Sequence, residues 1–114
     1  MAHTQVSADN SVNEVVLEGR LGGVERKILP SGDEAVTFRV VVARGPRERG
    51  PSGRVAVDAL DCVAWRNEVG RRVERWGDGA EVRVEGAVRR RFWQGGSGPV
   101  SRVEIEVRRV TALR

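Results

Sequence analysis

Residues 55–93, VAVDALDCVAWRNEVGRRVERWGDGAEVRVEGAVRRRFW, decide the fold because they place one short helix between two strands. In 55–65 and 80–93, apolar side chains recur at every second position, which is the period of a β-strand. Between these two segments the apolar period changes to that of a helix, and this change predicts a helix over 67–76.

The predicted helix has a defined start, one apolar face and a defined end. Val69, Val73 and Trp76 line one face, and we expect all three to pack on the core. Asn67 is the residue type that caps a helix N-terminus. Gly77, within the sequence Gly-Asp-Gly, is typical of a helix end.

The flanking sequence adds three further strands. The segment 14–21 alternates, with a Gly-Gly bend after it and a short continuation through 24–29. The segment 35–43 is rich in β-formers, and we expect its Phe38 to lie in the core. After 95–99, a hairpin tip, the segment 101–110 alternates again.

The predicted order is three strands, one helix and two strands. This is the order of an OB fold, a five-stranded Greek-key barrel, and the fold class is therefore all-β with one short helix. A length of 114 residues fits one domain. We expect a flexible tail over 1–12 and the barrel domain over 13–112.

The chain carries a net positive charge, and its basic residues are almost all of one type. The net charge is +4, and 19 of the 20 basic residues are arginine, Lys27 being the exception. Arginine both grips phosphate and stacks on bases, but GC-rich coding would favour arginine equally well. The segment 44–54, with its glycines, prolines and arginines, predicts a mobile basic loop.

Several function classes are disfavoured by what the sequence lacks. It has no apolar run long enough for a membrane helix and no secretory leader, so we expect a cytoplasmic protein. Cys62 is the single cysteine and is predicted to be a small buried residue, while the only histidine, His3, lies in the tail. We therefore expect no enzyme activity, metal, cofactor, small-molecule substrate or membrane partner.

The ordered set of segments resembles the bacterial single-stranded DNA-binding protein family. The resemblance covers about residues 13–112, and its most characteristic part is the pattern V-x-V-E-G-x-x-R-x-R-x-W at 82–93. It implies an OB fold that binds single-stranded DNA, usually as a homotetramer. The matching segments are NEVVLEGRLGG (13–23), PSG (30–32), AVTFRVVVA (35–43), LDCVAWRNE (60–68), GDGAEVRVEGAVRRRFW (77–93) and VEIEVRRV (103–110).

The resemblance also implies which residues contact DNA. Trp65 and Trp93 match positions that stack on bases, and Arg89 and Arg91 match residues that contact the backbone. The chemistry agrees, because an indole can stack on any unpaired base and alternate residues of a strand point to one side. The further candidate DNA contacts are Arg39, Arg44 and Arg66.

The chain departs from the family pattern at four places. Two stacking aromatics are missing, since Gly45-Pro46-Arg47 and Ala59 stand in their positions. Asp61 replaces a residue that is often basic, and we expect an acid there to repel phosphate. No acidic tail follows Arg114, so either this is a short member of the family or the tail lies beyond that residue.

Three functions remain open at this point. The first is sequence-independent binding and protection of single-stranded DNA in replication, repair or recombination. The second is a protein-interaction subunit, an adaptor of the replication machinery that binds little DNA. The third is RNA binding on the same fold. With two stacking aromatics missing, we expect weak DNA binding by one protomer and strong dependence on salt.

Overall fold

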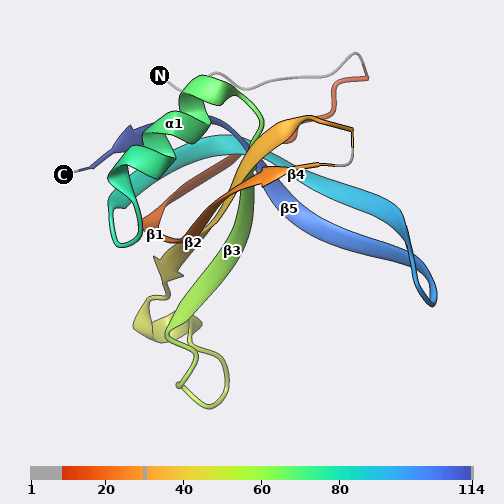
Figure 1. The fold of residues 1–114 in the computed structure, drawn as a ribbon. Coiled ribbons are helices and arrows are strands. Elements are labelled where there is room, and N and C mark those ends of the chain that lie inside the picture. Colours follow the sequence, from red (N-terminus) through yellow and green to blue (C-terminus); the bar gives the residue numbers. More distant parts are fainter. Residues whose placement is uncertain (1–8, 30, 114) are drawn as a thin grey trace.

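The computed structural model describes residues 9–29 and 31–113 of the chain (Figure 1). Residues 1–8 of the predicted tail, including His3, lie outside the described residues. No helix among the described residues is long and apolar enough to cross a membrane. The elements are, in chain order, β1 (Val15–Ile28), β2 (Glu34–Ala43), the 3-10 turn η1 (Pro46–Glu48), β3 (Val57–Ala64), α1 (Asn67–Trp76), β4 (Glu81–Gly95) and β5 (Gly98–Ala112).

The five strands close into a barrel in the order β1-β2-β3-β5-β4. The ring closes because β1 pairs with β2 along its second half and with β4 along its first half. β3 and β5 are parallel, and a parallel neighbour requires a long crossover, which α1 and β4 provide. The predicted all-β, OB-type Greek-key barrel with one short helix is confirmed.

Small apolar side chains fill the barrel. Val40, Val82 and Val84 are fully buried, and Phe38 is buried as expected from the sequence. Burying one such side chain contributes roughly 1.5–3 kcal/mol to folding. The buried core cluster comprises Leu21, Val36, Phe38, Val40, Cys62, Ala64, Val69, Val73, Val82, Val84, Ile105, Val107 and Val110.

β1 bends between its two neighbours. The register with β2 shifts between Gly22 and Glu25, and Gly23 has a φ of 59°, a conformation that favours glycine. The bend and the continuation predicted from the Gly-Gly pair are therefore both present, and they form one strand rather than two.

α1 has the predicted bounds but not the predicted cap. Its N-cap is Arg66, with no side-chain cap hydrogen bond, so the prediction of Asn67 as cap is wrong. Val69 and Val73 are buried, and Trp76 is partly buried against the same core. Gly70, which by itself weakens a helix, lets α1 approach the sheet, because a Cβ there would lie 2.7 Å from Val36 Cγ2.

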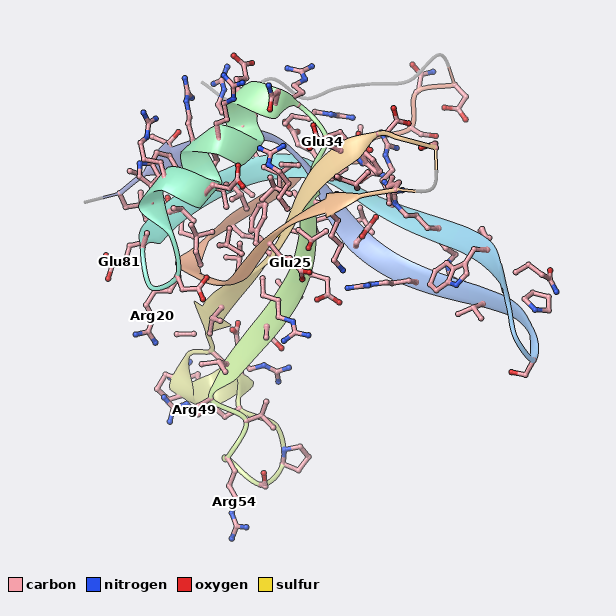
Figure 2. All side chains as sticks on the ribbon, viewed as in Figure 1. Arg20, Glu25, Glu34, Arg49, Arg54 and Glu81 are labelled. Carbon is pink, nitrogen blue, oxygen red and sulfur yellow. The ribbon has the colours of Figure 1, made fainter. Side chains whose placement is uncertain are left out.

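The segment 44–54 contains the 3-10 turn η1 and is anchored to the start of β3 by hydrogen bonds. Arg44 holds it, because its guanidinium donates hydrogen bonds to Asp58 (2.6 and 2.9 Å) and to the Glu48 carbonyl (3.1 Å). The prediction of a mobile loop considered only its glycines and prolines and missed this anchor. Figure 2 shows Arg54 at the outer end of the loop, where it points away from the barrel.

Cys62 is buried on β3, as predicted, and this leads to a testable expectation. Burial is the main cause that raises the pKa of its thiol, to about 12, so the folded state favours the neutral thiol. Since only the thiolate reacts, we expect no reaction with a thiol reagent at pH 8 until the protein is unfolded. Stability should fall as the pH rises above the ordinary thiol pKa. Rapid labelling of the folded protein would contradict this expectation.

Candidate nucleic-acid interface

β4 and β5 form a hairpin that continues beyond the barrel (Figure 1). Their pairing runs from Val82 opposite Ala112 to Gly95 opposite Gly98, and directly opposite residues share one face of the hairpin. The outer face, as we name it, carries Arg89, Arg91, Trp93, Val100, Arg102 and Glu104. The inner face, which continues the barrel interior, carries Val88, Arg90, Phe92, Ser101, Val103 and Ile105.

The positions of Trp65 and Trp93 are both defined relative to Arg91. Trp65 directly follows β3, and the guanidinium of Arg91 lies over its ring, 4.5 Å from the ring centroid. Trp93 is two residues further along β4 and therefore shares the outer face of the hairpin with Arg91. Trp65 is only partly exposed, with Arg91 over its ring, whereas Trp93 is 48% exposed. Arg91 thus contacts Trp65 and lies on the same face of β4 as Trp93.

The two arginines that β4 contributes to the outer face are paired with carboxylates of β5. Arg91 forms an ion pair with Glu104, and Arg89 Nη2 lies 3.8 Å from Glu106 Oε1. Glu104 is buried, so its charge is compensated locally by Arg91. The positive charge predicted for this surface is thus present, but part of it is neutralised within the protein.

Asp61, the acid that we expect to repel phosphate, is itself paired with arginines. Its two oxygens contact two arginines from neighbouring strands, Arg39 at 3.2 Å and Arg102 at 2.9 Å. Burial raises the pKa of this carboxyl, but the hydrogen bonds from Arg39 and Arg102 outweigh burial and leave the pKa below its ordinary value. Asp61 therefore stays ionised between two guanidiniums.

The remaining candidate arginines lie in different places. Arg39 joins the outer face through Asp61, and the exposed Arg66 directly follows Trp65. Arg44 lies at the opposite end of β3 from Trp65, where it is paired with Asp58, so the structure does not bring it to the two indoles. The pairing also raises the pKa of Arg44 and lowers that of Asp58, mainly through their mutual hydrogen bonds.

Phe92 was expected in the core or in an interface, and it is not in the core. It lies on the inner face of the hairpin and is 71% exposed. The reason is that the hairpin has left the barrel at this point, so an inward direction no longer leads to other side chains. Val88 and Val103 are exposed on the same face for the same reason.

Trp65 also borders a cleft between the start of β2, the end of β3 and α1. The cleft has a volume of about 260 Å³, and Glu34, Arg66 and Asn67 line it together with Trp65. A cleft with both polar and apolar walls beside an aromatic ring suits a planar group with hydrogen-bonding edges. No local pattern of the sequence reveals this cleft, because its walls come from three separate segments.

Sequence reasoning also missed Arg102, Glu104 and Glu106. Their alternation on the last strand placed them on the side of β5 opposite Ile105 and Val107, and Arg102 is exposed there, but Glu104 is buried. Their partners depend on the register of β5 against both β4 and β3, and no short-range pattern reveals that register.

The family model and the solved structure that match this chain both concern single-strand binding proteins. A family model described as the single-strand binding protein family matches residues 12–113. Among solved structures, the chain is similar to one described as the Plasmodium falciparum SSB complex with ssDNA, with a TM-score of 0.72 and 24% sequence identity. That match covers 91% of this chain and 96% of the other, and at this identity it shows the shared fold. No curated protein sequence matches the chain.

Proposed function

The chain belongs to the single-strand binding protein family, and from this premise we propose that it binds single-stranded DNA without sequence preference. Membership also makes it a binding protein rather than an enzyme. The proposed contacts are bases stacked on Trp65 and Trp93 and phosphates held by neighbouring arginines, among them Arg89 and Arg91. The observation that carries this proposal is the guanidinium of Arg91 over the ring of Trp65, on the same face of β4 as the exposed Trp93.

The chemistry of this surface favours an unpaired strand. Only a single strand offers free base faces, and an indole accepts each of them at roughly 1–3 kcal/mol per base with little dependence on sequence. A guanidinium stacks on an indole and still has donors at its edge for phosphate oxygens. Arg91 therefore supports both contacts at one place, next to Trp65.

One protomer is too small a binding site for tight binding. Two stacked bases supply about 2–6 kcal/mol, whereas a nanomolar complex needs about 12 kcal/mol. We therefore propose that several linked protomers act together, as in a homotetramer, and that phosphate contacts supply the rest. The exposed apolar side chains on the inner face of the hairpin, Val88, Phe92 and Val103, offer such an assembly an area to bury.

Tryptophan fluorescence tests this function directly. We expect dT oligomers to quench the emission strongly, and we expect the affinity to fall steeply between low and moderate salt. The variants Trp65→Phe and Trp93→Phe separate the two signals, while Trp76, partly buried on α1, supplies an unquenched background. An adaptor that binds little DNA predicts almost no quenching, and a preference for ribo-oligonucleotides would indicate RNA as the partner.

The cellular role that we propose follows from this binding. A protein that coats unpaired strands keeps them open and shields them from nucleases during replication, repair or recombination. Such a role places the protein in the cytoplasm, with the DNA. Titration with dT oligomers of increasing length, with the mass of each complex measured, gives both the number of protomers and the length of strand that they protect.

A further inference from the structure

Asp61 forms ion pairs that connect β3 to its two neighbouring strands, β2 and β5. It lies on β3, and its oxygens contact Arg39 on β2 and Arg102 on β5, one oxygen to each guanidinium (3.2 and 2.9 Å). The side chain of Asp61 is 34% exposed, and those of Arg39 and Arg102 are 64% and 48% exposed. One anion is thus held between two arginines at an accessible place.

Two guanidiniums that converge on one anion form the arrangement by which arginines hold a phosphate group. We propose that Arg39 and Arg102 form a phosphate subsite for the DNA backbone, and that Asp61 occupies this subsite as an internal competitor in the free protein. This inference rests on the proposed function. It goes further because it assigns a subsite and a residue that limits affinity.

The position of the subsite fits a strand that crosses the outer face. Arg102 lies directly opposite Arg91 in the β4–β5 ladder, and Arg91 contacts the ring of Trp65. Directly opposite residues have Cα atoms about 4.5–5.5 Å apart. Arg91 and Arg102 therefore lie side by side on the outer face, and a strand that crosses this face can reach both the subsite and Trp65.

The charge of the surrounding cleft explains why Asp61 matters. The cleft has a volume of about 270 Å³, and its cations Lys27, Arg39 and Arg102 are matched by three carboxylates, those of Glu25, Asp61 and Glu104. Removing the charge of Asp61 leaves the cleft positive and frees the donors of both arginines. The two existing ion pairs are partly exposed, and such pairs are weak enough for a phosphate to displace them.

The test compares Asp61→Asn with Glu18→Gln by the anisotropy of a fluorescein-labelled dT oligomer. Glu18 is a matched control, because it forms an ion pair with Arg83 (2.9 Å) on β1 and β4, and its replacement changes the net charge equally. We expect Asp61→Asn to bind about tenfold more tightly at low salt, and Glu18→Gln to change affinity less than about twofold. The slope of log K against log salt should steepen by about 0.7 per added phosphate contact.

A second pair of variants ties the gain to the two arginines. Adding Arg102→Gln to Asp61→Asn should remove the gain, and Asp61→Ala, which leaves no side-chain acceptor for either arginine, should also bind more tightly than the wild type. The inference is overturned if the wild type binds dT while both Asp61→Asn and Asp61→Ala behave like Glu18→Gln, bind more weakly or leave the salt slope unchanged. Absence of any binding by the wild type would instead overturn the proposed function itself. Thermal melting of each variant checks that it is folded.

Discussion

Replacement of both Trp65 and Trp93 by alanine should weaken binding of oligo-dT by between about 30-fold and 10⁴-fold. The range follows from roughly 1–3 kcal/mol lost per stacked base at two positions, with about 1.4 kcal/mol per tenfold change in affinity. Each single replacement should cost about 5-fold to 150-fold. The affinity is measured by fluorescence anisotropy at low salt. Salt also weakens the phosphate contacts, and the loss of affinity from that cause would obscure the loss from stacking.

The position of each indole determines the controls. Trp93 is well exposed on the hairpin, so its loss should leave the melting temperature almost unchanged. Trp65 is partly buried beneath Arg91, and Trp65→Phe, which keeps an aromatic face, should retain part of the affinity. Trp76→Phe on α1 should not change DNA binding. If the double alanine variant bound within threefold of the wild type, base stacking would be the wrong mechanism and phosphate contacts would have to carry the affinity.

Local patterns were sufficient to predict most of the fold. Each strand has a clear period of two, and the change of period at Asn67 marked the start of α1 correctly. The same period placed Arg89, Arg91 and Trp93 on one side of β4, which is where the structure has them. Short-range periodicity sufficed because these features depend on residues within one element.

The features that the sequence did not reveal depend on contacts between elements. Asp61 was expected to repel phosphate, but its ion pairs with Arg39 and Arg102 could not be foreseen, because these residues lie on other strands and only the register brings them together. Phe92 was expected in the core or in an interface, and it is not in the core because the period that points it inward says nothing about where the barrel ends. In both cases the surroundings of the side chain are set by other elements, which a local period does not describe.

Replacement of Gly86 by alanine should destabilise the fold by about 3 kcal/mol or more, which lowers the melting temperature by roughly 10–15 °C. A Cβ at this position would lie 1.9 Å from the carbonyl oxygen of Glu106 and 2.9 Å from its carbonyl carbon. Both atoms belong to backbone, so no side-chain rotation can relieve the overlap and β5 would have to move. Thermal unfolding followed by circular dichroism measures the change.

The location of Gly86 explains why no other residue fits. It is paired with Val15 of β1 and with Val107 of β5, and the register of β4 shifts at this point. Here β4 bends from the barrel into the hairpin, and the strands approach too closely for a side chain.

Gly22→Ala is the matched control, because a Cβ at Gly22 meets nothing within 4 Å, and it should change stability by only a few tenths of a kcal/mol. Equal stability of the two variants would mean that the bend does not need a glycine. Because the overlap involves the backbone of β5, Gly86→Ala should also shift the hairpin, and with it Arg91 relative to Trp65.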